Sequence, residues 1–377
     1  YVFFDGVFGH FKSNAQDYAS PNGLAVTETG PAQGSLGRQS EYPEDLAFFK
    51  EVAKFWIEEL KIDGWRLDQA YQVPVGAWGE IRQAVAEASQ GVSYQMNGET
   101  VNPLGYMVAE IWSGEEQIAE TGYGTNEQHG LCSAFDFPGR YRVVQNFAAQ
   151  EDGFFFTDAS TLVGIFDTHD VYPEHAIPNL MITNHDVVRF GDLLQRAGIA
   201  EPSDEEYWQR HKAAYAFLAA YTGPITLYYG DEIGDEVANF AERLDCASDG
   251  GVGAIAGLCD DHVSRSNGKV EGLASEQGGE VFTANAQQAE LRDYIAELMQ
   301  LRANYPALSQ GERLSVLSVG ELYADVKSFG GQQVLYIANM TATTQLAVLP
   351  PEYMGLGNHN TFQDLQSNEQ YAFAAGI

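Results

Sequence analysis

Three carboxylates stand where short apolar runs end, at places where a strand would give way to a loop. They are Asp68 in IDGWRLDQA, Glu110 in GYMVAEIW and Asp186 in NLMITNHDVV. Apolar runs separated by helical patterns are typical of buried parallel strands, and the loops after such strands carry the catalytic groups of β/α barrels. Two carboxyl groups that converge on one such edge indicate glycosidic-bond chemistry.

The neighbours of these carboxylates indicate different roles for them. Arg66 and Asp68 are two residues apart, so on a strand their side chains lie on the same side. A cation beside a carboxylate keeps it ionised, as a nucleophile requires. An apolar, aromatic segment surrounds Glu110 and favours a protonated general acid. His185 precedes Asp186, whose charge could stabilise a positive charge developing on a sugar.

Each motif also has a structural interpretation when it is taken alone. Arg66 and Asp68 could form an ordinary ion pair, and Glu110 could be a solvated residue at a strand end. The neighbours His185 and Asp186 could anchor a loop or bind a metal. All three motifs on successive strand ends, in this order, are much harder to explain by structure alone.

The elements that must position these residues alternate between strands and helices. The pattern predicts strands near 2–5, 62–67, 107–111, 131–137, 180–183 and 225–229. It predicts helices at 213–221 and 291–302, and one whose apolar face carries Leu46, Phe49, Val52, Trp56 and Leu60. This alternation predicts a parallel β/α architecture. Since a closed (β/α)8 barrel needs eight strands, we expect about two further β/α units before Tyr1.

Two domains are expected. A catalytic barrel should occupy residues 1–312, with a short loop subdomain at 11–40. From about Arg313 the pattern changes to period-two segments, which are LSVLSV, YADVKSF, QVLYIANM and TQLAVLP. Such segments predict a small antiparallel, sandwich-like β domain over residues 313–377.

The composition excludes several classes of protein. Asp and Glu number 53 against 20 Lys and Arg, which gives a formal net charge of −33. Nucleic acid is excluded as a partner because it needs a basic footprint, and an anionic membrane surface is disfavoured for the same reason. We expect an extracellular or periplasmic protein, either from a saline source, where salt screens self-repulsion, or an ordinary acidic secreted enzyme. The sequence leaves the oligomeric state open.

The three cysteines show no metal-ligand spacing. Cys132 lies in an apolar stretch and is predicted to be a buried thiol. Cys246 and Cys259 flank a glycine-rich loop and could close a disulfide, a question that spacing alone leaves open.

Four ordered segments resemble the conserved blocks of the α-amylase superfamily, glycoside hydrolase family 13. They are FDGVFGH, GWRLD, AEIW and TNHD, and YYGDEIG resembles the eighth strand with its following loop. The resemblance implies retaining hydrolysis of α-1,4 bonds in starch-like glucans or maltooligosaccharides, with an α-1,6-acting or transglycosylating relative as the alternative. A catalytically silent carbohydrate-binding relative is a further alternative.

The resemblance also assigns roles to residues. Asp68 becomes the nucleophile, Glu110 the acid/base and Asp186 the stabiliser of the transition state. His10, His185 and Arg66 are assigned contacts to sugar, and Arg66 also orients the nucleophile. Asp5 and Arg189 are assigned as structural partners. Among the aromatic side chains near strand ends, Trp112 could stack on a sugar ring.

Two departures from the family pattern affect these expectations. The resemblance implies no cofactor for the chemistry and a structural calcium ion, but Gly9 stands where a calcium-binding asparagine is usual. After the nucleophile the chain reads Gln69-Ala70-Tyr71-Gln72 instead of continuing into a Lys-His pair. This weakens a strict α-amylase assignment. A metal-dependent hydrolase built on Asp5, His10, His185 and Asp186 is a remaining alternative, although their spacing does not indicate a transition metal.

Overall fold

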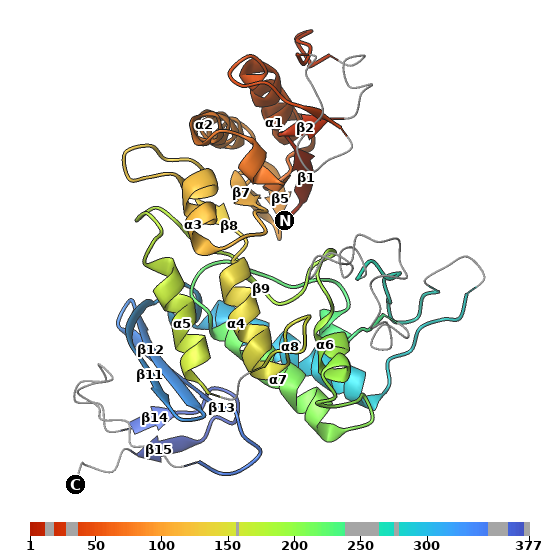
Figure 1. The fold of residues 1–377 in the computed structure, drawn as a ribbon, viewed down its shortest axis with the longest axis vertical. Helices are drawn as coiled ribbons and strands as arrows, with labels where there is room; N and C mark the ends of the chain where they lie inside the picture. Colours follow the sequence, from red (N-terminus) through yellow and green to blue (C-terminus); the bar gives the residue numbers. More distant parts are fainter. Residues whose placement is uncertain are drawn as a thin grey trace. The chain divides into compact units, whose positions relative to one another are not determined.

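The computed structural model describes residues 1–11, 19–27, 37–155, 158–237, 264–274, 279–345 and 361–372. The chain divides into two compact units, which are treated separately below (Figure 1). The first unit comprises Tyr1–Pro138 and Thr168–Asn179, and the second comprises Gly139–Asp167 and Leu180–Ile377. The predicted pairing of Cys246 with Cys259, and most of the predicted strand TQLAVLP, lie outside the described residues.

A parallel sheet forms the centre of the first unit. Its strands follow the chain in the order β1 (Phe3–Val7), β4 (Gly64–Asp68), β7 (Tyr106–Ala109) and β8 (Ser133–Ala134). β4 and β7 approach so closely at Gly64 that an added Cβ would lie 1.7 Å from the carbonyl oxygen of Tyr106. Only glycine fits there, where both strands begin, and the register continues from this pair to Leu67 opposite Ala109.

Two helices, α1 (Leu46–Leu60) and α2 (Val75–Gly91), pack against each other in the first unit (Figure 1). The predicted apolar face of α1 is wrong in part, because Trp56 and Leu60 are exposed. The buried stripe is Phe49, Ala53 and Ile57. The small Ala53 leaves room for the indole of Trp65, which donates a hydrogen bond to its carbonyl oxygen.

Short elements complete the first unit. Cys132, predicted to be buried, is a partly exposed free thiol. It lies just before the two-residue strand β8, outside the paired residues of the sheet. The remaining elements are β2 (His10–Phe11) with β3 (Arg38–Gln39), the helical turn η2 (Ala70–Gln72), the hairpin of β5 (Tyr94–Met96) and β6 (Glu99–Val101), α3 (Glu115–Ile118) and the π-helix η3 (Ala119–Tyr123).

The second unit is mainly helical around a short parallel pair of strands. β9 (Leu180–Met181) pairs with β10 (Ile225–Thr226), so all six predicted parallel strands are present, although β8, β9 and β10 have two residues each. The predicted stripe of Leu291, Ile295 and Leu298 is buried on α8. The helices are α4 (Phe137–Phe147), α5 (Ser160–His169), α6 (Phe190–Arg196), α7 (Glu205–Ala220), η4 (Asp231–Ile233), α8 (Ala286–Asn304) and α9 (Pro306–Gln310).

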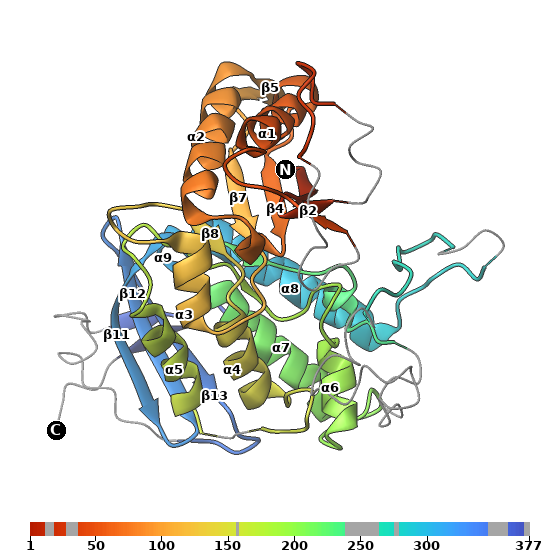
Figure 2. The same ribbon diagram turned by 45° about the horizontal axis from the view of Figure 1, so that its top comes forward.

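Antiparallel strands follow the last helix of the second unit. β11 (Glu312–Val319), β12 (Leu322–Phe329) and β13 (Gln332–Asn339) form one sheet, which lies beside α7 and α9 (Figure 2). A separate hairpin consists of β14 (Thr361–Gln363) and β15 (Gln370–Ala372). Among the described residues no helix is long and apolar enough to cross a membrane.

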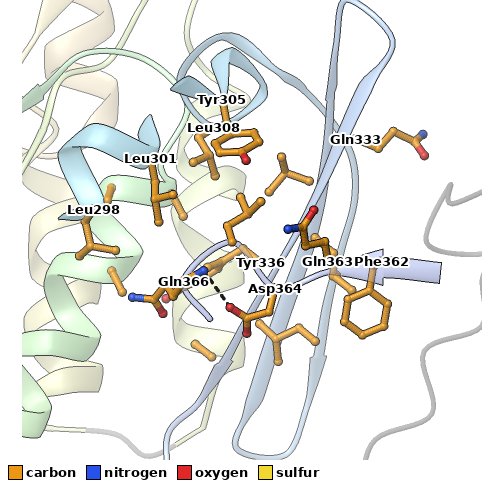
Figure 3. A pocket seen from close by; sticks show the side chains of 18 of the residues that line it. Leu298, Leu301, Tyr305, Leu308, Gln333, Tyr336, Phe362, Gln363, Asp364 and Gln366 are labelled. Atoms are coloured by element: carbon orange, nitrogen blue, oxygen red, sulfur yellow. Dashed lines mark hydrogen bonds between the residues drawn. The ribbon is translucent and has the colours of Figure 1, made fainter. Parts of the chain in front are cut away.

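A pocket of about 640 Å³ lies between α8 and strand β13 within the second unit (Figure 3). Its walls include Leu298, Leu301 and Tyr336, and near Asp364 the backbone amide of Gln366 donates a hydrogen bond to that carboxylate. None of the site residues predicted from the sequence lines it. The pocket therefore belongs to the packing of the C-terminal strands against the helices.

Candidate active site

Arg66 gathers the carboxylates of the first unit. It lies on β4 opposite Asp5 of β1, and one of its nitrogens, Nη1, lies 2.9 Å from Asp5 Oδ1 and 2.7 Å from Asp68 Oδ1. Its other terminal nitrogen, Nη2, lies 3.9 Å from Glu110 Oε2. Burial disfavours the charge of Arg66, but attraction by Asp5 and Glu110 outweighs this, and the pKa of Arg66 lies above its usual value. The guanidinium is therefore a permanent cation among three carboxylates.

The register of two strands brings Asp68 and Glu110 together. Leu67 of β4 pairs with Ala109 of β7, so the next residue on each strand is a carboxylate. Adjacent strands lie about 4.8 Å apart, and residues in register on parallel strands point to the same face. Glu110 is almost fully buried, whereas Asp68 is partly exposed. The sequence predicted an apolar, aromatic environment for Glu110. The structure differs in one respect, because the cation of Arg66 lies within ion-pair distance of Glu110.

The residue after Asp68 turns the backbone toward Glu110. Gln69 adopts a left-handed conformation, with φ of 43° and ψ of 49°, which is uncommon for residues other than glycine and clusters at functional sites. Its backbone N–H donates to Glu110 Oε2 over 2.9 Å. The turn therefore supplies a hydrogen bond to Glu110 immediately after β4 ends at Asp68.

His10 lies in contact with a glutamine of the same unit. Its Nδ1 lies 2.8 Å from Gln72 Oε1. Gln72 Nε2 donates to Gln69 Oε1 over 2.7 Å, and that oxygen also accepts from the hydroxyl of Tyr71. Four residues from two distant segments are thus joined by hydrogen bonds.

Gly9 does not fit the calcium site that the resemblance implies. An added Cβ would lie 2.4 Å from Gln72 Cβ, so there is no room for an asparagine side chain. The carbonyl oxygen of Gly9 already accepts from the N–H of Ser40 over 2.9 Å and from Gln39 Nε2 over 3.2 Å. Within the described ranges, no group of three or more His, Cys, Asp and Glu side chains could hold a metal ion.

In the second unit, two cationic or polar groups contact Asp186. Oδ2 lies 3.0 Å from His185 Nε2, and Oδ1 lies 2.6 Å from Arg265 Nη2. The backbone N–H groups of Asp186 and Val187 both donate to Asn184 Oδ1. This Asx turn and the flanking side chains orient Asp186 after the short strand β9.

Arg189 is buried and joins three segments of the second unit. Its Nη1 donates to the carbonyl oxygen of Tyr229 over 3.0 Å, and its Nη2 donates to Ser266 Oγ over 3.1 Å. The guanidinium also lies over the rings of Tyr228 and Tyr229, at 4.8 and 5.3 Å from their centroids. These contacts fix the segment that carries Arg265 and so support Asp186.

Several buried carboxyl groups surround Arg189. Asp231 and Asp235 lie 3.9 and 3.7 Å from its guanidinium nitrogens, and Lys269 also pairs with Asp235. Burial raises the pKa of Asp231 to about 7, because desolvation outweighs the attraction of Arg189. Burial likewise raises the pKa of Asp192 to about 7. This part of the molecule is therefore sensitive to pH.

The predicted residues form two groups. The structure joins Asp5, Arg66, Asp68 and Glu110 in the first unit, and it joins His185 and Asp186 in the second, where Arg189 supports them indirectly. In the first unit, the predicted aromatic Trp112 stacks on Phe137, with ring centroids 5.7 Å apart.

Sequence reasoning missed Gln69, Gln72 and Arg265 as members of the site. The departure from the family pattern at Gln69–Gln72 was a usable signal for the two glutamines. Nothing near Arg265 in the sequence pointed to Asp186, which lies 79 residues before it.

Comparison with known proteins identifies the family. Residues 41–311 match the family described as Alpha amylase, catalytic domain. Neopullulanase 2 of Thermoactinomyces vulgaris is 26% identical over 323 residues, 85% of this chain and 43% of its own length. A cyclomaltodextrinase of Geobacillus thermopakistaniensis is 25% identical over 321 residues, 83% and 43% of the two chains. The chain thus spans less than half the length of these curated relatives.

Solved structures agree with this result. AmyP in complex with maltose aligns over 100% of this chain and 71% of its own, with 48% identity and a TM-score of 0.88. The α-amylase of Geobacillus thermoleovorans complexed with acarbose covers 98% of this chain and 72% of its own, with 20% identity and a TM-score of 0.67, and so supports the fold alone. The fold is the β/α barrel with a C-terminal antiparallel β domain, and the chain belongs to the α-amylase superfamily, glycoside hydrolase family 13.

Proposed function

We propose that this protein hydrolyses α-1,4-glucosidic bonds of starch-like glucans or maltooligosaccharides with net retention of configuration. The pairing of Leu67 with Ala109 carries the proposal, because it places Asp68 and Glu110 one strand spacing apart. Retaining enzymes hold their two carboxyl groups about 5–5.5 Å apart, whereas inverting enzymes need about 6.5–9.5 Å to admit a water molecule. Neighbouring strands lie about 4.8 Å apart and the two side chains point to the same face, so the register supports the shorter, retaining separation.

In the proposed mechanism Asp68 attacks the anomeric carbon while Glu110 gives its proton to the departing glycosidic oxygen. A covalent glycosyl-enzyme forms, and Glu110 then removes a proton from water as the water attacks the same carbon. Arg66 orients the attacking carboxylate, since its Nη1 donates a hydrogen bond to Asp68 Oδ1 over 2.7 Å. The partial exposure of Asp68 leaves it accessible to a substrate.

The family resemblance supplies the proposed roles of Asp186, His185 and His10. Asp186 is almost fully buried and stabilises the positive charge that develops on the sugar ring. The imidazoles of His10 and His185 donate or accept hydrogen bonds with sugar hydroxyl groups next to the cleaved bond. Trp112 is proposed as an aromatic surface for a sugar ring.

A second candidate function is action on α-1,6 bonds or cyclic glucans, or transfer to another sugar. The relatives named neopullulanase and cyclomaltodextrinase favour testing it, and the turn at Gln69–Gln72 supports it, since the Lys-His pair of many α-amylases is absent there. In transfer, a sugar hydroxyl replaces water in the second step, and the same residues act.

Product analysis separates these functions. Full-length protein is incubated with starch, pullulan, cyclomaltodextrin, isomaltose and sucrose, and products are followed by chromatography and by NMR of the anomeric protons. Initial products of retained configuration, lost in Asp68→Asn and Glu110→Gln, are expected. Products of inverted configuration would overturn the mechanism, and no turnover on any substrate would favour a carbohydrate-binding relative.

We further propose that the protein works outside the cytoplasm, in the extracellular space or the periplasm. A net charge of −33 supports this through its effect on solubility in salt. Cell fractionation followed by detection of the native protein tests the proposal. Recovery in the cytosol alone would contradict it and would match the location in the name of a relative, intracellular maltogenic amylase.

A further inference from the structure

Gly9 and Gln72 depend on each other sterically. The position where a residue-9 side chain would begin lies 2.4 Å from Gln72 Cβ and 2.7 Å from Gln72 Oε1. Gln72 can therefore occupy its place only because residue 9 has no side chain. The glutamine amide fills this space and reaches the next residue, His10, over 2.8 Å.

The hydrogen bonds of Gln72 give its amide a direction. Its Nε2 donates to Gln69 Oε1, an oxygen that also accepts from the Tyr71 hydroxyl. With its nitrogen used in this way, Gln72 presents its oxygen to the imidazole. An amide oxygen only accepts, so Nδ1 of His10 must carry the proton. Nε2 of the neutral ring is then left as a hydrogen-bond acceptor.

We propose that Gln72 is a positioning residue that fixes the orientation and the tautomer of His10 without a metal ion. In this arrangement His10 keeps an Nε2 lone pair for a sugar hydroxyl, a step that rests on the proposed function. The amide chain ends at Gln69, whose backbone N–H donates to Glu110 Oε2. The turn after the nucleophile therefore positions both the candidate acid/base and the candidate sugar contact.

Uncharged groups suit this task. The Asp5, Asp68 and Glu110 carboxylates already lie around Arg66. An additional carboxylate or cation beside His10 would change the charge balance of the site, whereas a glutamine amide orients the ring without doing so. The two departures from the family pattern, at Gly9 and at Gln72, are therefore linked, because each residue depends on the other sterically.

Nitrogen-15 NMR of the imidazole rings tests the tautomer directly in the full chain. At about pH 8, where an ordinary histidine is neutral, the wild type should show His10 protonated at Nδ1. The His10 signals, among those of 8 histidines, are assigned by their loss in His10→Asn. Gln72→Met keeps the length of the side chain but removes the amide, so the ring should revert toward the Nε2-protonated form that free histidine prefers. Gln72→Glu retains an acceptor oxygen and should keep the proton on Nδ1.

An Nε2-protonated His10 in the wild type, or unchanged signals in Gln72→Met, would overturn the proposal. Kinetics supply the second arm: Gln72→Met should lower kcat/KM about tenfold, the size expected for one hydrogen bond. This loss should vanish in a His10→Asn background, because Gln72 acts through His10. An equal loss in both backgrounds would also overturn it. If the wild type turns over no glucan, the proposed function fails, while the NMR result still decides the role of Gln72.

Discussion

The two groups of candidate catalytic residues are held in different ways. In the first unit, strand register sets Asp68 and Glu110 side by side, and backbone and amide groups around Gln69 complete the arrangement. In the second unit, Asp186 follows a strand of two residues and depends on the side chains of His185 and Arg265. In the first arrangement the backbone sets the spacing and Arg66 adds the charge, whereas the second depends mainly on charged side chains.

The two kinds of support should respond differently to solution conditions. Strand pairing changes little with pH or salt, whereas ion pairs respond to both. Arg189 and the carboxyl groups near it make the second unit the part in which conditions can alter the candidate site. Substitutions can therefore test the contrast in one unit against the other.

The largest effect is expected from Arg66→Met, which removes the cation that contacts Asp68 and Glu110. We expect kcat to fall by about 10³-fold, the upper range for loss of one preorganised electrostatic contact. Activity on the best substrate, with circular dichroism to confirm folding, measures this. Arg66→Lys keeps the charge but not the fork of donors and should lose less. A loss below about tenfold for Arg66→Met would contradict this expectation and would sharpen the contrast, since strand register alone would then suffice in the first unit.

Arg189→Met tests the ion pairs that support Asp186 in the second unit. Removal of a fully buried guanidinium leaves Asp231 without its nearby cation, and we expect a loss of about 3–5 kcal/mol in unfolding free energy. Chemical denaturation measures it. The matched control is Arg210→Met, because Arg210 pairs with Glu206 on the partly exposed face of α7 and should cost about 1 kcal/mol or less. Equal losses in the two variants would contradict the anchoring role of Arg189.

Gly9→Asn tests the steric coupling in the first unit. Its Cβ would lie 2.4 Å from Gln72 Cβ, so the variant should lose about 2–3 kcal/mol of unfolding free energy through overpacking. The double variant Gly9→Asn with Gln72→Gly removes the clash and should be less destabilised than the sum of the single changes. Simple additivity in thermal or chemical denaturation would show that the two positions are independent.

The pH dependence around Asp231 should be smaller. Its pKa is raised from 3.8 to about 7 in the folded protein, so between these values the folded state binds more protons than the unfolded chain. Its contribution to stability therefore falls as the pH rises through this window. We expect the unfolding free energy of the wild type, relative to Asp231→Asn, to fall by about 1–2 kcal/mol from about pH 6 to about pH 7.5. A constant difference would contradict this.

The first unit could be predicted largely from its sequence because its signals are local. Arg66 and Asp68 share a strand, Glu110 ends the next strand, and both strands appear as apolar runs at the expected places. The face of α1 was mispredicted, since large apolar residues mark a helix but do not reveal which side meets the sheet. There, packing against Trp65 selected the small Ala53.

The surroundings of Asp186 could not be predicted to the same extent. His185 is its neighbour and was found, but Arg265 comes from a segment far along the chain, and no periodicity links the two. The carboxyl groups near Arg189 also carry no pattern in the sequence, because burial and ion pairing arise only when α6, η4 and residues 264–269 pack together. Long-range charge contacts are a property of the fold that local spacing does not encode.

The register of β4 with β7 has a consequence for insertions and deletions. One residue gained or lost within either strand would move Asp68 or Glu110 to the opposite face, because side chains alternate along a strand. The connection between the strands, which includes α2 and the β5–β6 hairpin, can change length without altering the register. Evolution can thus remodel the hairpin loop and leave the distance between the two carboxylates untouched.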